Sequence, residues 1–302
     1  MIFQNDTGAN DQIRPNPQKR NILIQRPSRS PWWLLVTLGL VLAFIINVAD
    51  SNTYQLAWGE VQKGIWTTIW VTVVAYALAL MLGLILALLR RPSTSIAYNL
   101  LVYQPATVVV EIIRGIPTLV LVFYITLAFV PQIVGMLNEL GASMLADDTR
   151  WPDLARWMRS LSPRDIPTVH RAIVALAISY AAFLSEIFRA GLDSIDIGQR
   201  EAARSVGMTE WQILRFIILP QAIRNILPAL GNDFIAMLKE SSLVSVVGVQ
   251  DITRAGQSFA AATFTFFQAY NVVAITYLVL TLTLSMIVKL IETYLGRGRK
   301  IS

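Results

Sequence analysis

Long apolar runs separated by short polar segments dominate this chain. Each run is near the ~20 residues that an α-helix needs to cross the hydrocarbon core of a membrane. We therefore expect an all-α protein, a polytopic transmembrane helix bundle with six spans. The predicted spans are 31–49, 67–89, 98–130, 172–188, 223–249 and 264–291, with a short external turn at 251–263 between the last two.

The third run, 98–130, is too long for one span and contains charged and helix-breaking residues. Glu111 and Arg114 are three residues apart, so on a helix they can pair and lower the cost of lying below the headgroups. Gly115 and Pro117 favour a break. We expect one helix near the cytoplasmic face, a kink after Gly115, and then a span.

The polar segment 190–220 interrupts the apolar pattern between the fourth and fifth spans. Two pairs of residues have the spacing of a capping box, in which a side-chain oxygen accepts from the free N–H groups of a first helical turn. The segment is therefore predicted to be helix, turn, helix at a membrane surface. The signals are Asp196 with Gln199 for the first start, Thr209 with Gln212 for the second, Gly207 for the stop between them, and Pro220, which should break or kink the second helix after 210–219.

Composition and charge support a membrane protein. Of 302 residues, 55% are apolar and 15% charged, whereas soluble chains average about a quarter charged. The formal charge of +6 comes from basic residues in short segments between apolar runs, as the positive-inside rule expects, rather than from a nucleic-acid-binding surface. The segments at Arg90, 189–224 and Arg297 then share the cytoplasmic side with both termini.

The ends of the chain and one long connection lie outside this core. We interpret 1–30 as a cytoplasmic tail and 31–49 as an uncleaved N-terminal span, because the apolar run lies too late for a signal peptide. The connection 131–169 has nearly balanced charge and two tryptophans, which suits an external loop with short interfacial helices. Residues 293–302 form a basic cytoplasmic C-terminus.

The 190–220 segment also contains a specific motif. Glu201-Ala202-Ala203, three residues, Gly207, nine residues, and then Ile217, Leu219 and Pro220 reproduce every position of a known pattern. The chain resembles the ABC importer permeases, whose EAA loop has this pattern. The flanking sequences EIFRAGL at 186–192 and RGIP at 114–117 resemble the branch that imports polar amino acids such as histidine, glutamine, glutamate and arginine.

The resemblance covers about 62–292 and implies the type I ABC importer permease fold, with five core spans and 31–49 as an extra one. It implies that the 190–220 segment docks on a separate ATPase, with Glu201, Ala202, Ala203 and Gly207 in the motif and Arg200 and Arg204 at its rim. The other implied partners are a second permease copy or a similar permease, an extracytoplasmic solute-binding protein, an amino acid substrate and membrane lipid, in a bacterial plasma (inner) membrane.

The chain has no ATP-binding motif of its own. Neither the phosphate-binding G-x-x-x-x-G-K-[ST] nor the dinucleotide-binding G-x-G-x-x-G occurs. We expect no catalytic residue and no bound cofactor, with ATP and magnesium on the partner ATPase. The lack of cysteine and the single histidine, His170, make a metal site implausible.

Polar residues in the fifth span need a reason, because a charge at the bilayer centre costs about 2.5–3.5 kcal/mol on insertion scales. Residues seven apart lie nearly above one another on a helix, so Asn232 with Lys239 and Asp233 with Glu240 form one side, here called the polar stripe. With Ser241 they could line the pathway of an amino acid. Equally, they could pair among themselves or with Arg114 and hold the bundle together.

Glu186 and Arg189 are three residues apart at the cytoplasmic end of a span, where pairing explains them. We assign them, with Glu111, Arg114 and Pro117, to a structural role that could include shaping an inner gate.

Two other functional classes fit parts of the sequence. The segment 201–215 resembles a DNA-binding helix-turn-helix, but a membrane span follows so closely that a recognition helix could hardly enter a groove. A secondary transporter could instead use Lys239, Glu240 or Glu111 as an ion or proton relay.

Overall fold

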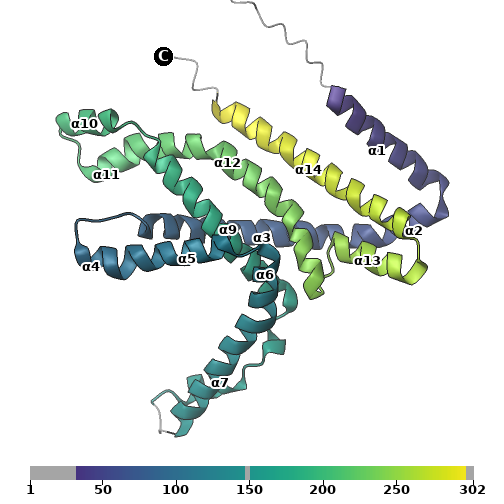
Figure 1. The fold of residues 1–302 in the computed structure, drawn as a ribbon, viewed down its shortest axis with the longest axis horizontal. Coiled ribbons are helices and arrows are strands. Elements are labelled where there is room, and N and C mark those ends of the chain that lie inside the picture. The colour runs from purple at the N-terminus through teal and green to yellow at the C-terminus, as the bar shows by residue number, and fades with distance from the viewer. Residues whose placement is uncertain (1–31, 147–149, 297–302) are drawn as a thin grey trace, which may run out of the picture. The chain divides into compact units, whose positions relative to one another are not determined.

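The computed structural model describes residues 32–146 and 150–296, and every regular element in these ranges is a helix (Figure 1). The predicted tail 1–30 and the charged residues at 297–302 lie outside the described residues. The chain divides into two compact units, Met1–Ala43 and Phe44–Ser302. In the first, residues 32–43 are helical. All the remaining architecture belongs to the second.

The elements follow one another with short connections. In chain order they are α1 (Trp32–Asp50), α2 (Asn52–Val61), η1 (Gln62–Gly64), α3 (Ile65–Leu89), α4 (Ile96–Tyr98), η2 (Asn99–Tyr103), α5 (Gln104–Gly115), α6 (Thr118–Phe123), η3 (Tyr124–Phe129), α7 (Val130–Ala146), α8 (Pro152–Ser160), η4 (Pro163–Asp165), α9 (Thr168–Asp193), α10 (Ile197–Ser205), α11 (Glu210–Ile213), η5 (Leu214–Ile218), α12 (Leu219–Glu240), η6 (Ser241–Val247), α13 (Ile252–Thr263) and α14 (Phe266–Gly296).

Six stretches of the described chain are helical, long and apolar enough to cross a membrane. The all-α bundle is thus confirmed, but the six differ from those predicted. The run 98–130 contributes to two of them, and α1 is not among them, so its crossing of the membrane stays a prediction. The six are Asn52–Leu89, Ile96–Gly115, Thr118–Ala146, Thr168–Asp193, Glu210–Val247 and Phe266–Tyr294.

The packing of α3 against α9 forms the centre of the second unit. A Cβ on Gly83 would lie 2.9 Å from the Leu184 Cβ and 3.0 Å from the Ala181 carbonyl oxygen, so glycine is what lets the two helices approach this closely. Further along both helices Arg90 meets Glu186, so the helices run in the same direction. The buried residues here include Val71, Ala75, Tyr76, Ala79, Leu176, Tyr180, Leu184, Met237 and Val244.

A second apolar cluster joins α2, α13 and α14 at the end of the bundle opposite to α10 and α11 (Figure 1). It contains a helix where the sequence suggested only a short external turn at 251–263. The turn prediction is wrong because Asp251 caps a regular helix, α13, whose Ile252, Phe259 and Ala260 are buried in this cluster.

The expected break after Gly115 is confirmed. α5 ends at Gly115, Ile116 is extended with φ −100° and ψ 131°, and Pro117 is the N-cap of α6. The residue before a proline avoids the helical region because the proline ring would clash with it. The local sequence therefore sets this break.

Three other prolines do not end helices. Pro105, Pro131 and Pro220 each follow two residues after a π-helical turn, at η2, η3 and η5 respectively. In such a turn each backbone N–H donates to the carbonyl five residues earlier instead of four. This leaves space for the proline ring and tolerates the lack of a proline N–H. Pro220 therefore does not break its helix, since α11, η5 and α12 follow without interruption, and the kink expected as the alternative stays a prediction.

The connection 131–169 is also more helical than expected. α7 continues the helix that begins at Thr118, and α8 packs on it as a hairpin. A Cβ on Gly141 would lie 2.6 Å from the Ala155 carbonyl oxygen and 2.8 Å from the Arg159 nitrogen, so glycine permits this contact. Its position outside the membrane stays a prediction.

An ion-pair network fixes the end of α3 that leads to Arg90. Arg90 Nη1 lies 2.6 Å, and Arg114 Nη1 3.5 Å, from Glu186 Oε1, while Arg189 Nη2 lies 2.7 Å from Glu186 Oε2. Glu111 Oε1 lies 3.5 Å from Arg90 Nη2 and 3.6 Å from Arg114 Nη1. The two pairs predicted at three-residue spacing are confirmed. Arg90, only 6% exposed, joins them across three helices.

Backbone packing fixes the other end of α3. The buried Asp251 accepts from the Arg254 N–H at 2.8 Å and from the Tyr277 hydroxyl at 3.2 Å. The Ile252 N–H donates to Thr68 Oγ1 at 3.2 Å. Burial raises the pKa of the Asp251 carboxyl, although the hydrogen bonds that it accepts act in the opposite direction. This junction ties α13 to α3 and α14.

We predict that Gly64→Ala destabilises the protein. A Cβ at this position would overlap the backbone of Asp251 and Ile252, which cannot move aside as a flexible side chain would. The expected loss is about 1–3 kcal/mol, the usual cost of overpacking, measured by thermal unfolding of the purified protein in detergent.

Gly59→Ala is the matched control, because nothing lies within 4 Å of a Cβ there and alanine favours a helix interior. Equal melting temperatures for Gly64→Ala and the wild type would contradict the close contact.

We also predict that Arg90→Gln and Glu186→Gln each lower stability by about 1.5–3 kcal/mol, because each leaves part of a charged network unpaired. The double variant should lose less than the sum, since each change removes the other's partner. Thermal unfolding of the four proteins measures this coupling.

Arg91→Gln is the control, because the Arg91 side chain forms no ion pair or hydrogen bond with another described residue. Additive losses for Arg90→Gln and Glu186→Gln would show that the two groups do not interact.

Candidate functional site

The 190–220 segment lies at one end of the bundle, where α10 and α11 are joined by a tight turn (Figure 1). α10 starts at Asp196, whose Oδ1 accepts from the Gly198 N–H at 2.6 Å. The cap is as expected, but the capping box with Gln199 is not formed. Gln199 Oε1 instead accepts from Gln221 Nε2 at 2.6 Å, which links α10 to α12.

The turn after α10 depends on Gly207. Its φ is +80°, a conformation that glycine adopts without a Cβ clash. The Gly207 N–H donates to the Arg204 carbonyl at 2.9 Å, and the Met208 N–H donates to the Ala203 carbonyl at 3.1 Å. These two bonds are a Schellman motif, which satisfies carbonyls at the end of the helix.

The second start is the predicted capping box. The Thr209 N–H donates to Gln212 Oε1 at 2.8 Å, and the Gln212 N–H donates to Thr209 Oγ1 at 3.4 Å. Local interactions therefore set both ends of the turn, and the sequence predicted both ends correctly.

The two faces of α10 differ. Ala203 is 4% exposed and lies in a small core with Ile213 and Ile218. Glu201 and Ala202, next to it in sequence, are exposed. α10 thus presents a carboxylate beside a small residue to the surroundings, while the alanine behind it holds the helix against α11 and η5.

Arg200 and Arg204, predicted at the rim of the docking motif, lie against other parts of this chain. Arg204 Nε lies 2.6 Å from Glu210 Oε1, which ties α10 to α11 and raises the pKa of Arg204. Arg200 is half-buried and lines a hollow of about 270 Å³ that Arg91 also lines.

The polar stripe of α12 divides into two parts. Asn232 and Lys239 are exposed, whereas Asp233 and Glu240 are half-buried. No ion pair joins these residues to one another or to Arg114 among the described residues. Mutual pairing within the stripe is therefore not seen among the described residues, whereas a role in holding the bundle together stays a prediction.

Two tyrosines that sequence reasoning missed lie beside the buried half of the stripe. The Tyr180 side chain on α9 lies near Glu240, and Tyr76 on α3 lies near Asp233 while donating to the Leu230 carbonyl at 2.6 Å. A tyrosine in an apolar span is a signal that could have indicated them, because its hydroxyl needs a partner when buried. Ser241 is buried and donates to the Leu238 carbonyl at 2.7 Å.

The residues assigned to a structural or gating role come together. Glu111, Arg114, Glu186 and Arg189 are the network described above, and Pro117 starts the helix that follows the break. Arg90 was missed, although its place at the end of an apolar span was a usable signal.

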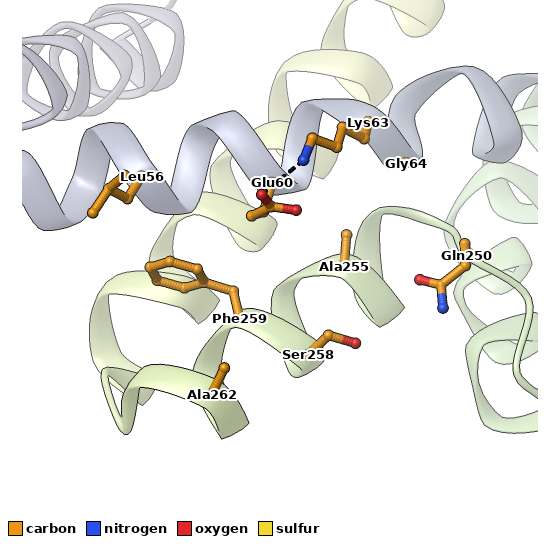
Figure 2. Close-up of a pocket in the computed structure, with 9 residues that line it drawn as sticks. All are labelled: Leu56, Glu60, Lys63, Gly64, Gln250, Ala255, Ser258, Phe259 and Ala262. Atoms are coloured by element: carbon orange, nitrogen blue, oxygen red, sulfur yellow. Dashed lines mark hydrogen bonds and ion pairs between the residues drawn. The ribbon is translucent and has the colours of Figure 1, made fainter.

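A larger hollow, of about 530 Å³, lies at the opposite end of α3 between α2 and α13 (Figure 2). Lys63 and Glu60 form an ion pair of 2.7 Å at its rim, and Phe259 and Ser258 line it from α13. No pattern in the sequence indicated this hollow. Across residues 32–146 and 150–296, no group of three or more histidine, cysteine, aspartate or glutamate residues could hold a metal ion.

Comparison with known proteins identifies the family to which these helices belong. Residues 79–301 match the family described as the binding-protein-dependent transport system inner membrane component. The chain is 37% identical over 195 residues to the probable amino-acid permease protein YxeN of Bacillus subtilis (strain 168), covering 65% of this chain and 75% of that protein. It is 34% identical over 187 residues to the glutamine transport system permease protein GlnP of Escherichia coli (strain K12), covering 62% and 73% respectively.

Two solved structures of ABC transporters contain chains of similar fold. A crystal structure of an amino acid ABC transporter with histidines has a chain that is 33% identical, with a TM-score of 0.61, covering 83% of this chain and 98% of that one. The MetNI methionine ABC transporter, 23% identical with a TM-score of 0.58 over 78% of this chain and 95% of that one, supports the fold. Because the family match extends over most of the described helices, including the whole 190–220 segment, this chain belongs to the family of binding-protein-dependent transport system inner membrane components.

Proposed function

We propose that this chain is the membrane-spanning subunit of an ATP-driven amino acid importer in a bacterial plasma membrane, and that the 190–220 segment couples it to a separate ATPase. The exposed Glu201 and Ala202, on a helix held at both ends, are the observation that carries the coupling role. The amino acid substrate is supported by similarity to proteins described as amino-acid and glutamine permeases.

Coupling requires a rigid contact. Gly207 and the Gln199 to Gln221 bond hold α10 relative to α12, so force applied at Glu201 reaches a membrane span directly. Ala202 lets a partner surface approach closely, and Glu201 can accept charged hydrogen bonds from it. Arg204 is paired with Glu210, and Arg200 lines the hollow with Arg91, so we leave both out of the proposed docking face.

The polar stripe is the proposed substrate pathway. Lys239 and Asn232 are exposed on a candidate span, where lipid contact would be costly, so this face fits a second permease copy or a similar permease. Asp233 and Glu240, with the hydroxyl of Tyr180, offer acceptors to the ammonium group of a passing amino acid. Ser241 stays a proposal for the same pathway.

The proposed orientation in the membrane follows from the distribution of basic residues. With Arg90 and Arg224 on the inside, α10 and α11 face the cytoplasm and the two ATPase subunits, while α2 and α13 face the solute-binding protein. Both termini are then cytoplasmic. ATP and magnesium belong to the ATPase subunits in this proposal.

The test is uptake by the reconstituted transporter. Wild-type proteoliposomes with the ATPase and the binding protein should accumulate amino acid only with ATP. Glu201→Lys should abolish at least about nine-tenths of that uptake while the chain remains inserted, because it reverses the charge at the docking face, where close charge pairs contribute ~1.5 kcal/mol or more.

Glu139→Lys, on α7, is the control for charge reversal elsewhere. Uptake that persists without ATP and follows an ion gradient would overturn the importer and favour an ion- or proton-coupled secondary transporter using Lys239, Glu240 or Glu111. Normal ATP-dependent uptake by Glu201→Lys would remove the docking role alone.

We predict that Glu240→Gln raises the amino acid concentration for half-maximal uptake about tenfold, because hydrogen bonds to a charged group contribute ~1.5–3 kcal/mol. Initial uptake rates over a range of substrate concentrations measure this, with the ATPase and the binding protein at constant amounts.

Glu292→Gln is the matched control, since Glu292 is another half-buried carboxyl in a candidate span, on α14 and not part of the stripe. If Glu240→Gln changes the melting temperature but neither the half-saturating concentration nor the selectivity, Glu240 is structural.

A further inference from the structure

The hollow beside the 190–220 segment is lined by two arginines that the coupling role does not use. Arg91 follows the end of α3, Arg200 lies on α10, and α11 with η5 closes the other side. Its volume is about 270 Å³. The lining residues are Arg91, Arg200, Glu210, Trp211, Leu214 and Ile218.

The charge in this hollow is not balanced by the chain itself. Neither Arg91 nor Arg200 has an ion pair or a side-chain hydrogen bond to another described residue. Glu210 is near enough to Arg200 to interact electrostatically, but its Oε1 is already 2.6 Å from Arg204 Nε. Two half-buried arginines therefore line a hollow in which the one carboxylate, Glu210, is already paired with Arg204.

The remaining lining is apolar and lies next to the ends of two candidate spans. α3 ends one residue before Arg90, and the candidate span Glu210–Val247 begins in the wall of the hollow. Trp211 is 66% exposed, and tryptophan favours the boundary between hydrocarbon and water. Leu214 and Ile218 add apolar side chains to the wall of the hollow.

We propose that this hollow binds the phosphate group of an anionic membrane lipid. Guanidinium groups present several N–H donors in one plane and suit phosphate oxygens, and basic pockets between membrane helices bind such headgroups. Trp211 and Leu214 contact the glycerol and the first part of the acyl chains. A free phosphate ion would use the arginines but leave this apolar wall uncovered, which is why lipid is the better ligand.

Lipid binding to the assembled transporter tests the site. The protein is purified in neutral detergent and titrated with phosphatidylglycerol or phosphatidylcholine, and bound lipid per permease is counted by native mass spectrometry. The wild type should bind phosphatidylglycerol in preference to phosphatidylcholine. The Arg91→Gln and Arg200→Gln double variant should bind phosphatidylglycerol about tenfold more weakly, since it loses two charge-assisted contacts.

Arg215→Gln is the matched control. Arg215 lies on η5 close to the hollow but does not line it, and its guanidinium lies 5.7 Å from the Phe216 ring centre. It should bind lipid as the wild type does. The lipid-free melting temperature of the double variant should also be unchanged, because neither substitution removes a bond within the chain. If the double variant does not fold, each single variant is tested in the same way.

Three results would overturn the proposal. Equal phosphatidylglycerol binding by the wild type and the double variant would place the lipid elsewhere. Displacement of the lipid by inorganic phosphate at equal concentration would assign the hollow to a free anion. Binding by the permease alone that disappears in the assembled transporter would assign the hollow to an acidic residue of the ATPase.

Discussion

The carboxylate of Glu186 lies among three guanidinium groups, and the arrangement of α3, α5 and α9 at that end of the bundle depends on this contact. A buried charge that loses its partner is costly, so these helix ends cannot separate without leaving Arg90 or Glu186 uncompensated. α9 continues from Glu186 for two turns and then enters the turn before α10. The network therefore fixes the base from which the 190–220 segment projects.

The two ends of α3 are held by different forces. At the Arg90 end the contacts are ionic and involve long side chains, which can exchange partners. At the Gly64 end the backbone of Asp251 and Ile252 lies directly on the helix, with no side chain between them. A rearrangement at the ionic end, where the proposed ATPase contact lies, must keep these charges paired, whereas one at the close-packed end must move the backbone of α13 away from α3.

The polar groups of the membrane region fall into three environments with separate roles. Asp233 and Glu240 lie near tyrosines inside the chain, Lys239 and Asn232 are exposed on the face proposed for a second permease, and Arg91 with Arg200 lines the hollow proposed to bind a lipid. In these proposals each group is kept from hydrocarbon by a different contact, which is a tyrosine hydroxyl, a partner chain or a lipid phosphate. The division follows from burial, because residues that adjoin in sequence on α12 differ in what packs against them.

The sequence by itself determined the features that depend on neighbours along the chain. The apolar runs, the caps at Asp196 and Thr209, the glycine turn at Gly207 and the break before Pro117 all arise from interactions within a few residues, and each is present as expected. Only the tertiary structure decided which distant groups meet. The sequence could not indicate that Arg90 completes the Glu186 network, that Gln199 bonds Gln221 instead of its own helix, or that α13 is a buried helix. These contacts depend on how separate helices pack, and a helix can present the same residue to water, to lipid or to a partner without any change in its own sequence.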